Sequence, residues 1–190
     1  MAFIGLPSKV TDKQYQVVKR LKAIFFDRDG TLIKTKLSKD NKPIAIKNIK
    51  ELEIYQSVKK ILNKLSKDYL IFLITNQPDV GRKKNTKKNV EEINNYLKDV
   101  LPIKKIYTCY CDDNNCKYRK PNIGMILHAS NQFNLNLKKS FVIGDRWKDV
   151  AAGVKAKCRT IFINRNYNEK VEHKADFIVN DFYEIKKIFK

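Results

Sequence analysis

The chain has 190 residues, of which 43% are hydrophobic, and a formal net charge of +20 at pH 7. This length is typical of a single domain with one hydrophobic core. No apolar run reaches the roughly 20 residues that a membrane-spanning helix needs, and the first residues lack the pattern of a secretory signal. We therefore expect a cytoplasmic monomer that has no membrane partner.

The excess of basic residues has two interpretations. A strongly basic surface can bind nucleic acid or another anionic partner. However, the lysines form no single block: short pairs such as Lys59-Lys60, Lys83-Lys84 and Lys138-Lys139 are spread along the chain. We attribute the charge mainly to a lysine-rich composition, and a nucleic-acid partner stays open.

The first half of the chain predicts strands that alternate with helices. Residues 1–21 form an extension in which Thr11 is placed to cap a short helix, and residues 22–190 form a single domain. Continuous apolar runs predict buried strands at 23–26, 69–74 and 105–108, and helical spacing of apolar residues predicts helices at 55–67 and 86–101. The polar segments 37–50 and 78–86 are predicted loops, the first of them over the end of the first strand.

The second half continues the alternation. We expect a helix that starts at Pro121, a strand at 140–143 and a helix from residue 147. Two further strands at 160–163 and 177–179 precede a final helix at 182–189. Such alternation implies right-handed crossovers, so the predicted fold is α/β, a doubly wound parallel sheet with helices on both faces.

Two aspartates follow the first strand directly, in the sequence DRDGT of residues 27–31. In an open α/β sheet, ligands bind at the carboxyl ends of the strands, so Asp27 and Asp29 should face a crevice. Neighbouring carboxylates repel each other unless a cation lies between them. The pair therefore indicates a magnesium site or an acid/base couple, and a calcium-type loop fits less well because the next residues offer few oxygen ligands.

Polar side chains also follow the next three predicted strands. They are Thr75 and Asn76, then Lys120 after a short loop, then Asp145 and Asp149. Because the carboxyl ends of parallel strands meet at one edge of a sheet, we expect these groups in a single site. A set of carboxylates, a hydroxyl, an amide and an ammonium group suits phosphoryl transfer.

Each group has a place in such a reaction. Asp27 can attack phosphorus to form an aspartyl phosphate, while Asp29 protonates the leaving alcohol and later deprotonates water. Magnesium, held by Asp27, Asp145 and the Asp29 carbonyl, would offset the repulsion between the carboxylate and the phosphate. The phosphate oxygens would be held by donors from the other strand ends, Lys120, Thr75 and Asn76.

The motifs DRDGT, TNQ, RKP and GDRWKD, in this order and spacing, resemble the haloacid dehalogenase superfamily of phosphohydrolases. The resemblance runs from about residue 23 to the C-terminus and implies a Rossmann-like fold with no cap or a minimal cap. It implies that Asp27 is the nucleophile and Asp29 the general acid/base. It also implies that Thr75 and Lys120 bind the phosphate. Asp145 would be the magnesium ligand, and Asp149 would support the metal site without direct contact to the ion.

Within the superfamily, residues 75–149 are most similar to small phosphatases of heptose bisphosphate and histidinol phosphate. The similarity includes Arg82 seven residues after Thr75, and the motif RKPNIGM of residues 119–125. It implies that Asn76, Arg82 and Arg119 contact the substrate. The expected function is magnesium-dependent hydrolysis of a small sugar phosphate such as D-glycero-D-manno-heptose 1,7-bisphosphate, with histidinol phosphate as an alternative.

The loop of residues 109–118 departs from the pattern of this branch, which has four zinc ligands before Arg-Lys-Pro. The corresponding positions here carry Cys109, Cys111, Cys116 and Tyr118, so the last ligand is replaced. Structural zinc normally has four protein ligands. Two interpretations stay open: zinc bound by the three cysteines and a nearby aspartate or water, or a lost site. In either case we expect thiols or metal ligands rather than disulfides in a cytoplasmic chain.

The altered loop also supports a second function. The phosphatase domains of polynucleotide kinase-phosphatases belong to the same superfamily, lack the zinc loop and can have the pattern Tyr-Arg-Lys-Pro-x-x-Gly-Met, which residues 118–125 match. A nucleic-acid 3′-phosphate is therefore the alternative substrate. We favour the small metabolite because the motif GDRWKD is more similar to the sugar-phosphate branch. A binding protein without catalysis is disfavoured because every catalytic position is present.

Overall fold

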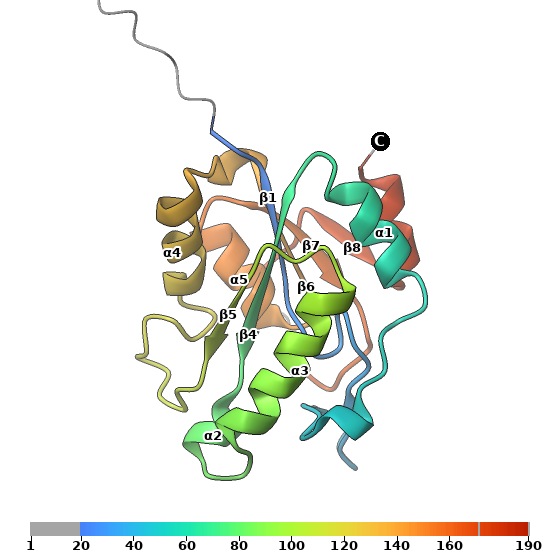
Figure 1. The fold of residues 1–190 in the computed structure, drawn as a ribbon, viewed down its shortest axis with the longest axis vertical. Helices are drawn as coiled ribbons and strands as arrows, with labels where there is room; N and C mark the ends of the chain where they lie inside the picture. Colours follow the sequence, from blue (N-terminus) through green and yellow to red (C-terminus); the bar gives the residue numbers. More distant parts are fainter. Residues whose placement is uncertain (1–19, 171, 190) are drawn as a thin grey trace, which may run out of the picture.

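The computed structural model describes residues 20–170 and 172–189, which form a six-stranded parallel sheet covered by helices (Figure 1). The helix expected near Thr11 lies outside these residues. The strands are β1 (Ala23–Phe26), β4 (Leu70–Asn76), β5 (Lys105–Cys109), β6 (Phe141–Gly144), β7 (Arg159–Ile163) and β8 (Phe177–Val179). They lie in the order β5-β4-β1-β6-β7-β8, and all neighbours are parallel. The predicted doubly wound sheet is confirmed.

Helices cover both faces of the sheet, as predicted. The α-helices are α1 (Val58–Leu65), α2 (Pro78–Gly81), α3 (Lys87–Val100), α4 (Gly124–Phe133) and α5 (Trp147–Lys155). Short 3₁₀ helices are η1 (Ile49–Glu51), η2 (Leu137–Lys139) and η3 (Phe182–Lys187). One core cluster packs α1, α3 and η3 against the sheet, and a second packs α4 and α5 (Figure 1). None of the helices in the described part of the chain is long and apolar enough to cross a membrane.

Two local predictions were wrong. The helix expected from Pro121 begins at Gly124, and Pro121 lies in the loop before it. The segment 78–86 is not all loop, since Pro78 starts the short helix α2. The last predicted helix is present as the 3₁₀ helix η3. None of these differences moves a strand end.

The central strand β1 fixes the position of the polar residues that follow it. Its four residues are fully buried, and they alternate between the two core clusters: Ile24 and Phe26 face one, Ala23 and Phe25 the other. Successive side chains of a strand point to opposite faces, so a continuous apolar run fits a strand that is covered on both sides. The order in which successive strands are added to the sheet reverses between β1 and β6, and α/β folds bind their ligands at such a point.

A small hairpin lies over this edge of the sheet. It consists of β2 (Lys36–Leu37) and β3 (Pro43–Ile44), which pair antiparallel. Residues 42–45 line the same cavity as Asp27. The polar segment that was predicted to be a loop over the carboxylates therefore has the expected position and forms a minimal cap.

Phe72 tests the packing of the core beneath the site. The ring is fully buried and lies with its centroid 5.4 Å from that of Phe25 and 5.0 Å from that of Phe133. Phe72→Ala should lower the free energy of unfolding by about 3–5 kcal/mol, because it removes buried area and leaves a cavity. Urea denaturation measures this loss. Leu127→Ala, at a position that is 43% exposed on α4, is the control and should change stability by about 0.5 kcal/mol or less. An equal loss in both variants would contradict the packing described here.

Candidate active site

Three carboxylates and one ammonium group meet at the carboxyl edge of the sheet. Asp27 directly follows β1, and Asp145 and Asp149 follow β6, with an oxygen of each of the three within 4.8 Å of the others. Lys120 Nζ lies 2.6 Å from Asp27 Oδ1 and 2.7 Å from Asp149 Oδ1. All four side chains are buried. The structure thus brings together the residues that the strand ends predicted.

Two glycines allow this close approach. Gly30 has φ +82°, a conformation that other residues rarely adopt, and a Cβ there would lie 2.0 Å from Asp145 Oδ2. A Cβ at Gly144 would lie 2.3 Å from Asp149 Cγ. Any larger residue at either position would push a carboxylate out of the cluster.

The cluster carries more negative than positive charge. Burial raises the pKa of Asp27 to about 6, although Lys120 opposes the shift. Burial also raises the pKa of Asp145 well above its ordinary value, and the charges of Asp27 and Asp149 add to the effect. Burial alone would lower the pKa of Lys120, but the two carboxylates raise it. Ionisation of all three aspartates would leave two uncompensated charges around one lysine.

A divalent cation fits this arrangement. Asp145 Oδ2 is buried and has no hydrogen-bond partner among the described residues, whereas Asp145 Oδ1 accepts a hydrogen bond of 2.8 Å from Thr31 Oγ1. Carboxylate oxygens are the ligands that magnesium prefers in proteins. Asp149 is fixed by the backbone: its Oδ2 accepts from Arg146 N at 3.0 Å, at the first turn of α5.

Asp29 is held by the buried side chain of Arg28 and by Gln77, which also lines the cavity. Its Oδ2 accepts hydrogen bonds from Arg28 Nε at 3.0 Å and from Gln77 Nε2 at 2.8 Å. Arg28 is fully buried and points away from the cavity, so it does not contact a ligand there. Gln77 was not predicted to have a role, although the motif TNQ contains it.

Two residues that were expected to hold phosphate oxygens have other contacts here. The side-chain amide of Asn76 donates to Lys120 O and accepts from Lys120 N, both at 3.0 Å. Thr75 Oγ1 accepts from Gln77 Nε2 at 2.8 Å, and Thr75 is not among the residues that line the cavity. Asn76 lines the cavity but also fixes the backbone that carries the lysine.

Above the cluster lies a cavity of about 430 Å³ with a basic wall. Its basic lining residues are Lys42, Arg82, Arg119, Lys120, Arg146 and Lys148. Arg82 pairs with Asp112 at 2.5 Å, Arg119 donates to Cys111 O at 2.7 Å, and Arg146 pairs with Glu169 at 2.6 Å. Both predicted arginines therefore reach the cavity. Lys42, Arg146 and Lys148 were missed, although the last two lie inside the motif GDRWKD.

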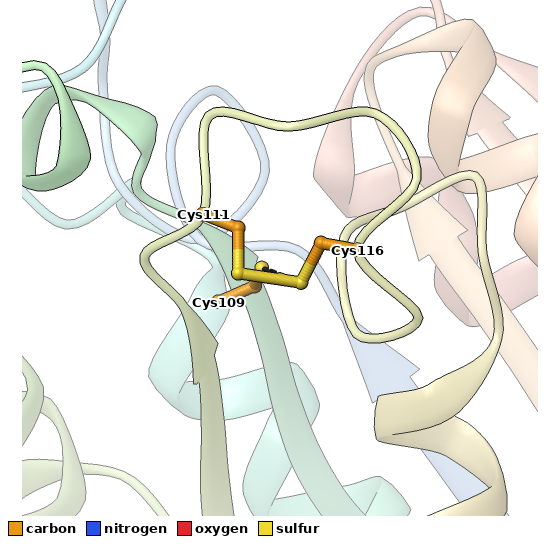
Figure 2. Close-up of side chains that lie close together, drawn as sticks. All are labelled: Cys109, Cys111 and Cys116. Carbon is orange, nitrogen blue, oxygen red and sulfur yellow. Dashed lines mark hydrogen bonds between the residues drawn. A yellow bond between two sulfur atoms is a disulfide. The ribbon is translucent and has the colours of Figure 1, made fainter.

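The cysteine loop corrects one expectation (Figure 2). Cys109, Cys111 and Cys116 lie together, as the zinc hypothesis required. However, Cys111 and Cys116 form a disulfide, and Cys109 Sγ lies 3.7 Å from Cys116 Sγ. Zinc binds thiolates, which the two bonded sulfurs no longer provide, so these residues do not fit a zinc ion in this state. The expectation of thiols rather than disulfides holds only for Cys109 and Cys158, which are free.

Known sequences match this chain over most of its length. A family model described as polynucleotide kinase 3 phosphatase matches residues 22–183. The chain is 31% identical over 150 residues to a D-glycero-alpha-D-manno-heptose-1,7-bisphosphate 7-phosphatase of Campylobacter jejuni, covering 76% of this chain and 83% of the relative. It is 32% identical over 146 residues to a D-glycero-beta-D-manno-heptose-1,7-bisphosphate 7-phosphatase of Helicobacter pylori, covering 73% and 80%.

Solved structures share the fold. A D,D-heptose 1.7-bisphosphate phosphatase from B. bronchiseptica, complexed with magnesium and phosphate, has a TM-score of 0.75 at 20% identity and covers 89% of this chain and 98% of its own. A HAD phosphatase from Thermococcus onnurineus has a TM-score of 0.60 at 17% identity, with 89% and 98% covered. Together with the motifs and their geometry, these matches show that the chain belongs to the polynucleotide kinase 3 phosphatase family and is a phosphatase of the haloacid dehalogenase superfamily.

Proposed function

We propose that the chain hydrolyses a small sugar phosphate, such as D-glycero-D-manno-heptose 1,7-bisphosphate, with magnesium and through an aspartyl-phosphate intermediate. The observation that carries this proposal is the buried group of Asp27, Lys120, Asp145 and Asp149, of which all but Asp145 line a basic cavity. Curated relatives at 31% and 32% identity are named for the 7-phosphatase reaction on this bisphosphate.

In the first step, Asp27 attacks the phosphorus atom and the bond from phosphorus to the alcohol oxygen breaks. Asp29 gives its proton to that oxygen, so the product leaves as a neutral alcohol. Lys120 keeps positive charge beside the attacking carboxylate. Magnesium, when held by Asp27, Asp145 and the Asp29 carbonyl, supplies the charge that offsets the repulsion between carboxylate and phosphate.

In the second step, Asp29 removes a proton from water, which attacks the phosphorus atom of the aspartyl phosphate. The bond between Asp27 and phosphorus breaks, which releases inorganic phosphate and restores the carboxylate. Asp29 ends with the proton that the next cycle needs. The two steps together consume one water molecule and release the alcohol and inorganic phosphate.

The cavity supports a small and strongly anionic substrate. A volume of about 430 Å³ lies in the range of pockets for small molecules. The hairpin residues Lys42 and Pro43 close one side, and Arg82 and Arg119 lie on its wall. A bisphosphate would place one phosphate at Asp27 and leave the second for this basic wall.

A polynucleotide 3′-phosphate is the second candidate. It is favoured by the description of the matching family model and by the net charge of +20. Binding to a nucleic-acid backbone depends on the release of counterions, so it weakens steeply with salt. A small bisphosphate carries far fewer phosphates than a polynucleotide, so its binding depends on salt less.

Magnesium-dependent phosphate release from a panel of substrates separates the two candidates. The panel holds heptose 1,7-bisphosphate, histidinol phosphate and a 3′-phosphorylated oligonucleotide. We expect the highest kcat/KM for the heptose compound, with weak dependence on salt. A preference for the oligonucleotide that falls steeply as salt rises would replace our proposal with nucleic-acid end processing.

Asp27→Asn should abolish turnover, because an amide cannot serve as the nucleophile, while the fold is retained. Phosphate release measures activity, and circular dichroism measures folding. Asp68→Asn changes an exposed aspartate outside the cavity and is the matched control, with unchanged activity expected. Full activity of Asp27→Asn would contradict the proposed mechanism.

Magnesium should stabilise the protein more at about pH 7.5 than at about pH 5. Because the pKa of Asp27 is raised to about 6, protons compete with the metal below this value. Without metal, stability changes with pH in the opposite direction. The pKa of Asp27 in the folded state exceeds the ordinary value of 3.8, so this carboxyl makes the protein less stable as pH rises through about 6. Thermal unfolding with and without magnesium measures both effects.

Asp145→Asn is the control for this titration, because it removes one proposed metal ligand. Its melting temperature should respond little to magnesium at either pH. An equal response of the wild type at both pH values, or an undiminished response of the variant, would contradict metal binding by these carboxylates.

A further inference from the structure

Arg28 is the largest fully buried side chain of the described residues, although it lies between two aspartates of the site. Its Nε and Nη2 donate to Asp29 Oδ2 and Oδ1 at 3.0 and 3.3 Å. Its Nη1 donates to Asn94 Oδ1 at 3.0 Å. A buried guanidinium is costly unless it is paired and hydrogen-bonded, so the charge of Asp29 and the amide of Asn94 are what allow it here.

Asn94 occupies a place where an apolar residue would be expected. It lies on the inner face of α3 between the buried residues Val90 and Leu97, and its exposed fraction is 2%. Its Nδ2 donates to Thr108 Oγ1 of β5 at 3.1 Å, while its Oδ1 accepts from Arg28. The helix α3 and the strand β5 thus hold the guanidinium group of Arg28 in place through Asn94.

The two oxygens of Asp29 have different surroundings as a result. Oδ2 accepts from Arg28 Nε at 3.0 Å and from Gln77 Nε2 at 2.8 Å. Among the described residues, Oδ1 accepts a single and longer bond of 3.3 Å, from Arg28 Nη2. Asp29 lines the cavity, and Oδ1 is the less tightly held of its two oxygens.

We propose that Arg28 is a positioning residue that fixes the Asp29 carboxyl, so that Oδ1 carries the proton that Asp29 transfers. The inference rests on the proposed role of Asp29 as general acid and base. In the first step the proton moves from Oδ1 to the alcohol oxygen as the bond from phosphorus to that oxygen breaks. Arg28 is fully buried and cannot touch substrate, so its loss should act on kcat and leave KM nearly unchanged.

The test compares aryl phosphates whose leaving phenols differ in acidity, from p-nitrophenyl to p-methoxyphenyl phosphate. Phenol release in the first turnover is measured by rapid quench for the full chain. A leaving group as acidic as p-nitrophenol needs no proton, whereas p-methoxyphenol does. The probes are independent of the natural substrate, so the result does not depend on the identity of the sugar.

One variant is Arg28→Lys, which keeps the positive charge but cannot bind both oxygens of Asp29 as a guanidinium does. The other is Asn94→Leu, which removes the hydrogen bonds to Arg28 and Thr108 and suits the apolar face of α3. Arg28→Lys should lower release from p-methoxyphenyl phosphate about 10- to 100-fold, and release from p-nitrophenyl phosphate by less than about threefold. Asn94→Leu should give a smaller selective loss. Arg159→Lys, an exposed position outside the cavity, should behave as the wild type.

Two results would overturn the proposal. Equal losses on both aryl phosphates in Arg28→Lys would mean that Arg28 has only a structural role. No selective loss in either variant would mean that it does not position Asp29. The proposed function has its own check: Asp29→Asn must show the selective loss, and without it the acid/base assignment of Asp29 fails, whatever the Arg28 variant does.

Discussion

The buried ammonium group of Lys120, which lies between the carboxylates of Asp27 and Asp149, is the constraint on which the rest of this site depends. Removing such charges from water is costly, and only close partners compensate the cost. Lys120 has two of them, Asp27 and Asp149, and Asn76 fixes its backbone. The strand ends, the glycine contacts and the first turn of α5 all serve to hold these charges within reach of one another.

Much of this arrangement could be predicted, because it follows from two regular features of the sequence. Apolar runs and helical spacing define a parallel α/β sheet, and a parallel sheet gathers its carboxyl ends at one edge. The residues after β1 and β6, Asp27 and Asp145, therefore had to meet once the strand order was right. Lys120 could be placed from its motif, although a loop separates it from β5.

The rest could not be predicted because it depends on where side chains point within a loop or a turn. Nothing in the local sequence shows that Arg28 turns inward while its neighbours face the cavity, although a polar Asn94 on an apolar helix face was a usable signal. The amide of Asn76 binds a backbone rather than a ligand for the same reason. The pairing of Cys111 with Cys116 depends on the path of the loop, which cysteine spacing does not determine.

The hairpin of β2 and β3 has a consequence for how this protein can change. Its tip is tied to the segment after β7, since Asn41 Nδ2 donates to Asn166 O at 2.7 Å and Asn168 N donates to Asn41 O at 3.1 Å. Both segments lie outside the central sheet, and neither supplies a residue of the carboxylate cluster. Substitutions in these two segments during evolution can therefore change the part of the protein that covers the cavity, and with it the substrate preference, while the reacting groups stay in place.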